Sequence, residues 1–325
     1  MPTSLHETKS CRQVFAAPAS LPGQFRNWLR YRRTGQAMFK KNLAAKLTLV
    51  PSAVVIAVCF YGTILWTFYI SLTHSTMLPN YKFYGFSQYA TLLSMPRWHT
   101  AFANMLIFGS LFIAGSLIIG TTLAALLDRN VKAEGLFRVF FLYPLSMSFV
   151  VTGLAWQWLL NPTTGVEALV RGFGWESFQF NWLASPEKAI YAVSIAAIWQ
   201  SSGLVMAIML AGLRGVDSDI WRAAKIDGIP VWRSYISIVL PMLRPLILTC
   251  VILLATAVVK SYDLVVAMTG GGPGISTDVP GKFVVDLLFQ RANISTAAAA
   301  AILMLLSVIC ALSPYVYIEL KRQKR

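Results

Sequence analysis

The sequence contains few charged residues for its length. Asp, Glu, Lys and Arg together make up 13% of its 325 residues, whereas hydrophobic residues make up 56%, and the mean hydropathy is +0.61. An ordinary soluble domain has roughly 25% charged and about 45–50% apolar residues. The shortage of charge therefore argues against a soluble enzyme and indicates an integral membrane protein.

Cysteine and histidine are also scarce. The four cysteines show no CxxC pair or regular spacing, and three of them lie in apolar runs, so neither a disulfide framework nor a zinc site is expected. The three histidines have no acidic neighbours at ligand spacing, which argues against a metal centre.

The motifs of several enzyme classes are missing too. The nearest approach to a GxxxxGK[ST] phosphate loop is Gly281-Lys282, but Ser276 stands at the first glycine position and Phe283 follows the lysine. Neither GxSxG nor HExxH occurs, and no paired carboxylates lie within an apolar stretch. We therefore expect a chain that is not an enzyme, with no catalytic residues, no nucleotide site and no bound cofactor.

Six stretches are long and apolar enough to cross a membrane as helices, which takes about 20 residues each. They cover about 46–70, 101–127, 137–160, 189–213, 244–268 and 296–318. The pattern predicts an all-α integral membrane protein with six transmembrane helices. It has a basic tail at 1–45, a transmembrane domain at 46–318 and a basic C-terminus at 319–325.

The distribution of Lys and Arg predicts how the helices are oriented. Of the 28 basic residues, 21 lie in the two tails and in the connections after the second and fourth stretches, whereas six lie in the other three connections. Basic residues collect on the cytoplasmic side, so both termini are predicted to be cytoplasmic. The net charge of +15 is then explained by topology in the lipid bilayer, and no nucleic-acid partner is expected.

The connection at 214–243 is far longer than the usual 2–8 residues between helices but has the signals of an ordered structure. Asp217, Ser218 and Asp219 are candidate N-caps, while Gly228 and Pro230 indicate a sharp end to the first helix. A second short helix is predicted at about 231–238. Two interpretations fit: an amphipathic pair resting on lipid headgroups, or a rigid knob that enters a cleft on a cytoplasmic partner.

This connection resembles the EAA loop of binding-protein-dependent ABC transporter permeases, which docks on the ATPase subunit. The resemblance rests on the run Arg222-Ala223-Ala224, which three further residues separate from Gly228, and on the later Leu240-Pro241. In this sequence Arg222 stands where the family usually has Glu. The resemblance implies that the residues of ATPase coupling are Trp221, Arg222, Ala223, Ala224, Asp227, Gly228, Leu240 and Pro241.

Further runs resemble the sugar-transporting branch of that family. These are Leu142-Tyr143-Pro144, the stretch 156–161, Tyr262-Asp263-Leu264-Val265 and Thr269-Gly-Gly-Gly-Pro273. The resemblance implies a MetI-like fold in the bacterial inner membrane and import of a sugar, such as a glycoside or disaccharide. It also implies a second related permease, two cytoplasmic ATPase subunits that bind ATP and Mg, and a sugar-binding protein at the outer face.

Several polar and aromatic residues within the apolar stretches are candidates for lining a solute path. They are Trp156, Gln157, Gln200, Lys260, Tyr262 and Asp263. Lys260 and Asp263 are three residues apart, so on one helix face they could form either a structural ion pair or part of the path. The small residues at 109–120 and 297–301 are expected to permit close helix packing.

Two alternatives remain open from the sequence. One is a secondary transporter or channel that works alone and uses Lys260 and Asp263 as its coupling pair. The other is an ABC importer subunit for a polyol or glycerol phosphate.

Overall fold

The computed structural model describes residues 48–78, 80–129 and 131–323. The predicted basic tail at 1–45 lies outside the described residues, as do the last two residues. The chain divides into two compact units, residues 1–65 and 66–325. In the first unit, the described residues form a helix with a π-helical segment, η1 (Ala57–Tyr61). It leads into α2 (Gly62–Ser71), whose last residues belong to the second unit.

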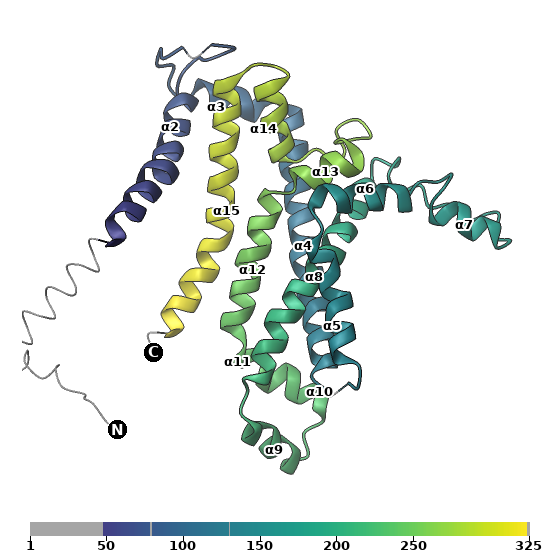
Figure 1. The fold of residues 1–325 in the computed structure, drawn as a ribbon. Helices are drawn as coiled ribbons and strands as arrows, with labels where there is room; N and C mark the ends of the chain where they lie inside the picture. The colour runs from purple at the N-terminus through teal and green to yellow at the C-terminus, as the bar shows by residue number, and fades with distance from the viewer. Residues whose placement is uncertain (1–47, 79, 130, 324–325) are drawn as a thin grey trace, which may run out of the picture. The chain divides into compact units, whose positions relative to one another are not determined.

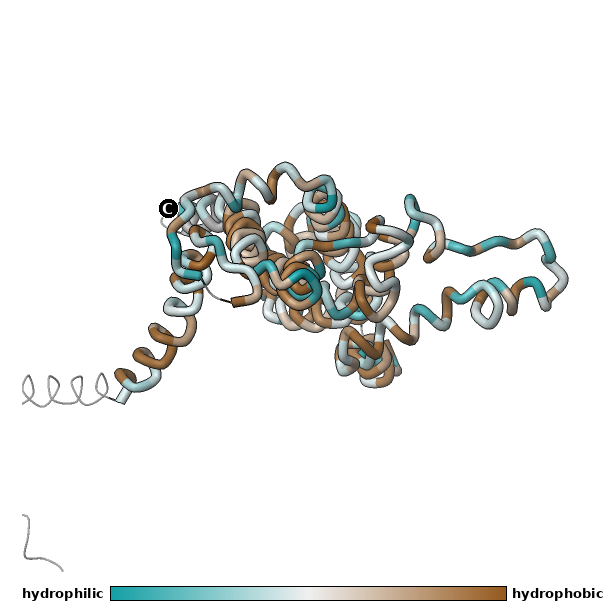
Figure 2. Tube along the Cα trace, turned by 90° about the horizontal axis from the view of Figure 1, so that it is seen from above, coloured by the Kyte–Doolittle hydropathy of each residue, from teal (hydrophilic) through white to brown (hydrophobic). Residues whose placement is uncertain are grey.

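The second unit is built from helices (Figure 1). In chain order they are α3 (Ser87–Ser94), α4 (Pro96–Leu127), α5 (Glu134–Leu142), the 3-10 helix η2 (Tyr143–Ser146), α6 (Phe149–Leu159), α7 (Val166–Gly172), α8 (Ala189–Arg214), α9 (Ser218–Ile226), α10 (Val231–Ser234), the π-helix η3 (Tyr235–Val239), α11 (Leu240–Met242), α12 (Arg244–Val259), α13 (Tyr262–Thr269), α14 (Pro280–Phe289) and α15 (Ile294–Gln323). Figure 2 shows hydrophobic residues along these helices and hydrophilic residues mostly in the connections.

Four helices in the described ranges are long and apolar enough to cross a membrane. They are Thr48–Ser71, Pro96–Leu127, Ala189–Arg214 and Ile294–Ser313. Two bent pairs, Glu134–Ser146 with Phe149–Leu159 and Val231–Met242 with Arg244–Val259, bring the number to six if each pair is one span. Five of these elements correspond to predicted stretches, whereas the second bent pair overlaps the fifth stretch, 244–268, only at Arg244–Val259 and bends just before it. The third and fifth stretches are each broken.

The third predicted stretch, 137–160, is not one continuous helix. α5 ends at Leu142, and the chain turns through 101° before α6. Pro144 has no N–H group to continue the helical hydrogen bonds. Ser148 then caps the new helix, since its side chain accepts a hydrogen bond from the N–H of Val151.

The fifth predicted stretch, 244–268, is broken as well. α12 ends at Val259 in a tightened turn, where the N–H of Ser261 donates to the carbonyl of Val258, and α13 begins at Tyr262. Lys260 and Asp263 are therefore not on one face of a continuous helix, and they form no ion pair with each other. At the C-terminal end α15 continues to Gln323, past the predicted boundary at 318.

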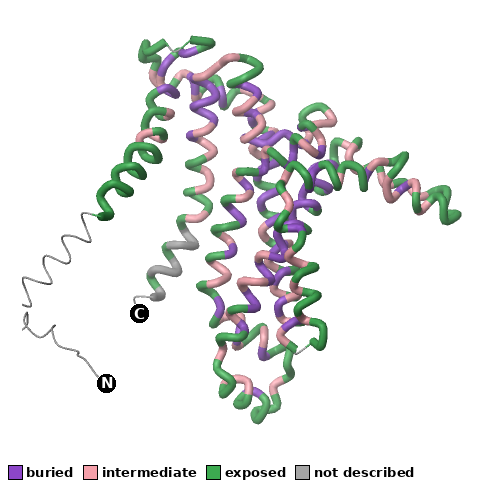
Figure 3. The backbone as a smooth tube through the Cα atoms, viewed as in Figure 1, coloured by how far each residue is buried: buried purple, intermediate pink, exposed green. Residues whose placement is uncertain are grey.

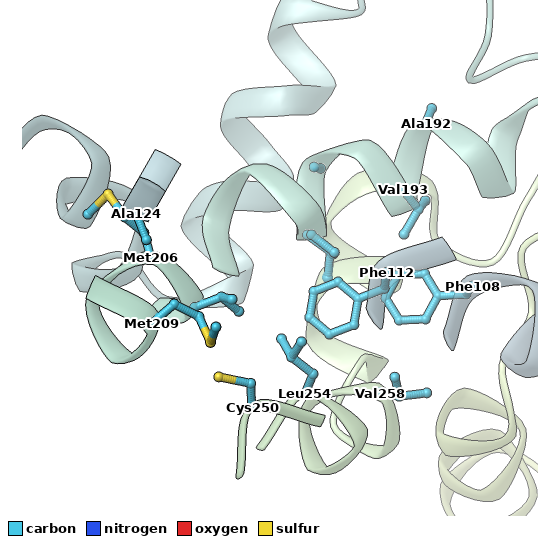
Figure 4. Packing of buried hydrophobic residues seen from close by; sticks show 14 of the residues in the cluster. Phe108, Phe112, Ala124, Ala192, Val193, Met206, Met209, Cys250, Leu254 and Val258 are labelled. Carbon is cyan, nitrogen blue, oxygen red and sulfur yellow. The ribbon is translucent and has the colours of Figure 1, made fainter. Parts of the chain in front are cut away.

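The packing of α4 against α8 forms the centre of the second unit. The main buried cluster takes in Phe108 and Phe112 of α4 and Met206 and Met209 of α8. In Figure 4 the two rings lie near Leu254 of α12, and the methionines lie near Ala124 of α4. The helices approach closely because α4 carries glycine at the contact. A Cβ atom on Gly120 would lie 2.5 Å from the Cβ of Val205 and 2.7 Å from the carbonyl oxygen of Ser202. The predicted role of the small residues in α4 is thus confirmed.

A cluster of four charges joins α4 to α14 at the end of the unit away from α9. Arg97 Nε donates to Asp278 Oδ2 at 2.5 Å and its Nη2 pairs with Asp286. Lys282 Nζ lies 2.6 Å from Asp286 Oδ2 and 3.8 Å from Asp278 Oδ1. Asn104 adds hydrogen bonds from its Nδ2 to the carbonyls of Ser276 and Asp278. Both carboxylates are buried, so each depends on its cationic partners.

The pKa of Asp286 reflects this arrangement. Burial alone would raise the pKa, but hydrogen bonds and charge from Lys282 and Arg97 outweigh burial and hold it below the ordinary value. A carboxyl group whose pKa is lower in the folded state stabilises the fold above its unfolded pKa. That contribution is lost as the pH falls through the folded value.

We predict that Gly120→Ala lowers the thermal unfolding midpoint of the detergent-solubilised protein. The new methyl group overpacks the contact between α4 and α8, at a cost of about 1–3 kcal/mol. Gly135→Ala is the matched control, because a Cβ there meets nothing within 4 Å and alanine favours a helix. Equal midpoints for the wild-type protein and Gly120→Ala would contradict the close contact.

We also predict that Asp286→Asn destabilises the protein at pH 7, by about 3–5 kcal/mol, because the two partly buried cations Arg97 and Lys282 lose a buried charged partner. The difference from wild type should narrow as the pH falls below about 4, where the unfolded carboxyl group itself becomes protonated. Asp219→Asn is the control: this carboxylate is 75% exposed in its ion pair, so its loss should cost less than about 1 kcal/mol. A pH-independent difference for Asp286→Asn would be evidence against the charge cluster.

Candidate functional site

The segment 214–243, called the coupling segment below, begins with a capped helix. Asp217 is the N-cap of α9, and its Oδ1 accepts a hydrogen bond from the N–H of Asp219 at 3.0 Å. Asp219 adds an acidic side chain in the first turn, where it interacts favourably with the positive end of the helix dipole. The predicted N-terminus of this helix is therefore present, and the cap is the first of the three candidate residues.

The helix ends in a sharp bend at Gly228. The backbone of Gly228 has φ +67°, and the N–H of Ile229 donates to the carbonyl of Ala224 at 3.0 Å. This is the left-handed termination that glycine permits without steric cost. Pro230 then caps α10. The predicted helix, bend and second helix are all present, although the second helix continues through η3 and α11 to Met242.

Two aromatic rings hold the two arms of the segment together and against the body of the unit. Trp221 of α9 meets Tyr235 of η3 edge-on, with ring centroids 4.9 Å apart, and both pack on the main buried cluster. The hydroxyl of Tyr235 donates to Asp128 Oδ2, just after the end of α4, at 2.9 Å. The coupling segment is therefore an ordered part of the fold that packs on the main buried cluster.

The predicted coupling residues divide between two faces. Ala224 is buried, and Trp221, Leu240 and Pro241 are partly buried. The outward face is exposed, as the tip of the segment in Figure 3 shows, and holds Arg222, Ala223, Asp227 and Gly228 together with Ile226. Ile226 is 85% exposed, so the tip presents a large apolar side chain among charged ones.

Arg222 is held along its own helix. Its Nη2 pairs with Asp219 Oδ1 at 2.5 Å and donates to Ser218 Oγ at 2.9 Å. Both partners of the ion pair are more than two-thirds exposed, so the pair contributes little to the stability of the fold. The guanidinium group is accessible to a partner of opposite charge.

A second contact at the start of the segment was not predicted. Glu134 of α5 pairs with Arg214 at 2.7 Å and with Arg138 at 2.5 Å. The spacing of Glu134 and Arg138 by four residues could have indicated an ion pair along one helix. The ion pair with Arg214 depends on the packing of α5 beside α8, which the sequence does not show. The segment is thus held at its first residue and again at Tyr235.

The candidates for a solute path lie on α6, α8 and α13, except for Lys260, which follows the end of α12. Trp156 of α6 lies against Trp199 of α8, with ring centroids 6.0 Å apart, and packs on the main cluster. Gln200 is buried, and its Nε2 donates to the carbonyl of Met147 at 2.8 Å, while its Oε1 is buried without a hydrogen-bond partner. The structure thus brings Trp156 close to the helix of Gln200.

The remaining path candidates lie near the break between α12 and α13 and on α6. Lys260, Asp263 and Gln157 are exposed, and Tyr262 is partly buried. α13 packs closely on α6, where a Cβ on Gly153 would lie 2.7 Å from Ala267. The helices that carry these residues are therefore neighbours. The residues remain candidates for lining a solute path.

The run Thr269–Pro273 forms a compact loop after α13. Gly271 has φ +92°, and a Cβ there would lie 2.7 Å from Cε of Lys282. Thr269 Oγ1 and Thr277 Oγ1 are hydrogen-bonded at 2.7 Å. Glycine is needed at 271 both for its backbone and for the close approach of Lys282, which places this loop directly on the charge cluster. In the described ranges, no group of three or more His, Cys, Asp or Glu residues could hold a metal ion.

Solved structures share this fold. A chain of a bacterial ABC transporter involved in the import of the acidic polysaccharide alginate aligns with a TM-score of 0.75 at 17% identity, covering 88% of this chain and 98% of that one. A chain of the bacterial alginate ABC transporter in complex with an alginate pentasaccharide-bound periplasmic protein aligns with a TM-score of 0.73 at 18% identity, covering 85% and 93%. The predicted fold of an ABC importer permease is confirmed.

Sequence relatives agree with the fold. A probable ABC transporter permease protein of Pyrococcus horikoshii is 35% identical, covering 86% of this chain and 96% of the relative. The xylose/arabinose import permease protein XacH of Haloferax volcanii is 31% identical, covering 83% and 86%. The trehalose/maltose transport system permease protein MalF of Thermococcus litoralis is 26% identical, covering 90% and 98%.

A sequence model of one family, described as binding-protein-dependent transport system inner membrane component, matches residues 116–324. The match takes in α8, the coupling segment, both halves of the broken fifth stretch and α15. The chain therefore belongs to this family of multi-pass inner membrane permease components of ABC transporters.

Proposed function

We propose that this chain is one of two permease subunits of an ATP-driven importer that carries a neutral sugar, such as a glycoside or disaccharide. The observation that carries the proposal is the coupling segment. It is a rigid, exposed projection attached to the helix core, in a sequence that has no phosphate loop of its own. A projection of this kind suits a permease whose energy comes from a separate ATPase.

The proposed substrate class rests on relatives. Two of the relatives are named as permease proteins, one for xylose and arabinose import and one for trehalose and maltose transport. The Thr-Gly-Gly-Gly-Pro run at 269–273 resembles the sugar branch of the family as well. The path candidates would suit a sugar, because Trp156 and Tyr262 offer ring faces and Gln157, Gln200 and Asp263 offer hydrogen-bonding groups. Lys260 would then face the same path.

The proposed mechanism uses the coupling segment as a lever. Two cytoplasmic ATPase subunits would bind ATP and Mg²⁺ and move toward each other, and each would carry the coupling segment of one permease with it. Because Trp221 and Tyr235 pack on the core, the motion would reach α4 and α8 and switch access to the path between the two sides. A solute-binding protein at the outer face would deliver the sugar. Both termini and the segment 214–243 would lie in the cytoplasm, as the basic residues indicate.

In this proposal Arg222 meets an acidic residue of the ATPase. The family usually has Glu at this position, and here the sign of the charge is reversed. The exposed guanidinium group is held only by an ion pair that contributes little to the stability of the fold. It can therefore exchange Asp219 for a carboxylate on the partner.

We predict that the affinity-tagged chain, purified from native membranes in mild detergent, brings with it a second permease and an ATPase that contains a phosphate loop. Mass spectrometry identifies the partners. A chain with Gly228→Asn should recover the same partners, since Asn tolerates a left-handed backbone. Recovery of the permease without any ATPase would contradict the proposal.

We predict that Gly228→Val abolishes the stimulation of ATP hydrolysis by the sugar-loaded binding protein, whereas Gly228→Asn retains most of it. A β-branched residue is strained at φ +67°, so the bend would open and the tip would move. Both variants should insert into the membrane in equal amounts, because Gly228 is exposed and a Cβ there meets nothing within 4 Å. Normal stimulation with Gly228→Val would count against the coupling role.

We predict that Arg222→Glu weakens binding of the ATPase by about tenfold or more, because a favourable charge contact becomes repulsive. The thermal midpoint of the permease alone should change little. A charge reversal of the facing acidic residue on the ATPase, in a double-mutant cycle, should restore binding. Undiminished assembly of Arg222→Glu would show that Arg222 does not face the partner.

A further inference from the structure

A small polar cavity lies at the end of the second unit opposite the coupling segment. It is bounded by the chain between α2 and α3, by α3 itself and by the start of α15, and it has a volume of about 210 Å³. Its lining consists of His74, Ser75, Thr76, Tyr84, Ser87, Gln88, Thr91, Asn293 and Thr296. None of these residues has been assigned a role in the path or in coupling.

The cavity has a rigid wall. Thr73, Ser75 and Ser295 form a buried network in which the N–H of Ser75 donates to Ser295 Oγ at 2.6 Å. The N–H of Ser295 donates back to the carbonyl of Ser75 at 3.1 Å. These bonds join segments 220 residues apart in sequence, so the cavity is part of the fold.

Two of the lining residues, Gln88 and Asn293, carry side-chain amides whose oxygens are hydrogen-bonded. Gln88 is 8% exposed, and its Oε1 accepts a hydrogen bond from Thr296 Oγ1 at 2.8 Å. Asn293 Oδ1 accepts from the N–H of Thr296 at 3.2 Å. Within the described part of the chain, neither Gln88 Nε2 nor Asn293 Nδ2 has an acceptor. These two donors are therefore free to bind a ligand in the cavity.

The chemistry of the lining selects one class of ligand. All nine residues are polar, and none of them is Asp, Glu, Lys or Arg, so the cavity offers no counter-charge to an ionic ligand. None is aliphatic either, so it offers no surface for an acyl chain. The rings of His74 and Tyr84 lie with their centroids 5.2 Å apart and supply the aromatic surface on which a sugar ring packs.

We propose that this cavity is a binding site for a single neutral polyhydroxylated ring, a monosaccharide or one terminal residue of a longer sugar. Gln88 Nε2 and Asn293 Nδ2 donate to its hydroxyl groups, while the Ser and Thr hydroxyls of the lining donate or accept. The volume is below the roughly 300–1,000 Å³ of pockets for drug-sized ligands, which matches one ring. The site is separate from the proposed path and needs no ATPase to bind.

The test uses the full chain in lipid nanodiscs, without ATPase or binding protein, and saturation-transfer NMR of dissolved sugars. D-glucose is the ring probe, sorbitol the open-chain polyol and D-glucuronate the charged analogue. We expect saturation transfer from the protein to glucose, weaker transfer to sorbitol and no transfer to glucuronate. Comparable saturation of glucose and sorbitol would overturn the preference for a ring, and saturation of glucuronate would overturn the preference for neutral ligands.

Two isosteric variants remove only the donors. Gln88→Glu and Asn293→Asp keep the oxygen that Thr296 contacts and replace the free amide nitrogen by oxygen. Each should weaken glucose binding about tenfold, as expected for the loss of a hydrogen bond worth about 1.4 kcal/mol. Gln290→Glu is the control for the added charge, since Gln290 is exposed and does not line the cavity; it should bind glucose like the wild type.

Thr76→Trp provides a test that leaves the buried network intact. Thr76 is exposed, and a large side chain there fills the cavity, so glucose saturation should be lost. Saturation that persists in Thr76→Trp and in both amide variants would place the sugar elsewhere and overturn the proposal, as would no saturation of glucose in the wild-type chain. Neither result bears on ATP-driven import, because the experiment contains no ATPase.

Discussion

The close contact between α4 and α8 is the constraint on which the rest of the second unit depends. Glycine at 115 and 120 lets the helices approach until Ile198 and Val205 fill the space of the missing side chains. α8 leads directly into the coupling segment. α4 ends next to Asp128, which accepts the hydrogen bond of Tyr235. One tightly packed pair of helices therefore positions the start of the coupling segment and its contact at Tyr235.

The two ends of the unit differ in how they are held. At the coupling end, one aromatic pair and a few surface ion pairs leave the tip exposed, with Arg222 and Ile226 facing outward. At the other end, buried charges around Arg97 tie α4 to α14 and to the loop at 269–273. Replacing one member of such a buried cluster is costly, so this end is fixed. The arrangement suits a lever: one end is available to a partner and the other holds the helices together.

Local features were predictable from sequence, and long-range ones were not. The N-cap and the bend at Gly228 follow from a few neighbouring residues, so the bend was predicted at its residue and the N-cap to within the three residues 217–219. The breaks at Pro144 and Lys260 were missed, because the apolar composition of a stretch indicates how long it is but not whether the helix changes direction within it. The spacing of Asp278, Lys282 and Asp286 by four residues could have indicated a charged helix face. Their partner Arg97 lies 181 residues from Asp278, and no pattern in the sequence connects them.

Uptake of labelled sugar into proteoliposomes tests the central claim, that transport is driven through the coupling segment by a separate ATPase. The complete complex is compared with this chain alone, each with ATP or with an imposed ion gradient. The account predicts uptake only by the complete complex and only with ATP and the sugar-loaded binding protein. Uptake by this chain alone under an ion gradient would contradict it and would identify a self-sufficient secondary transporter.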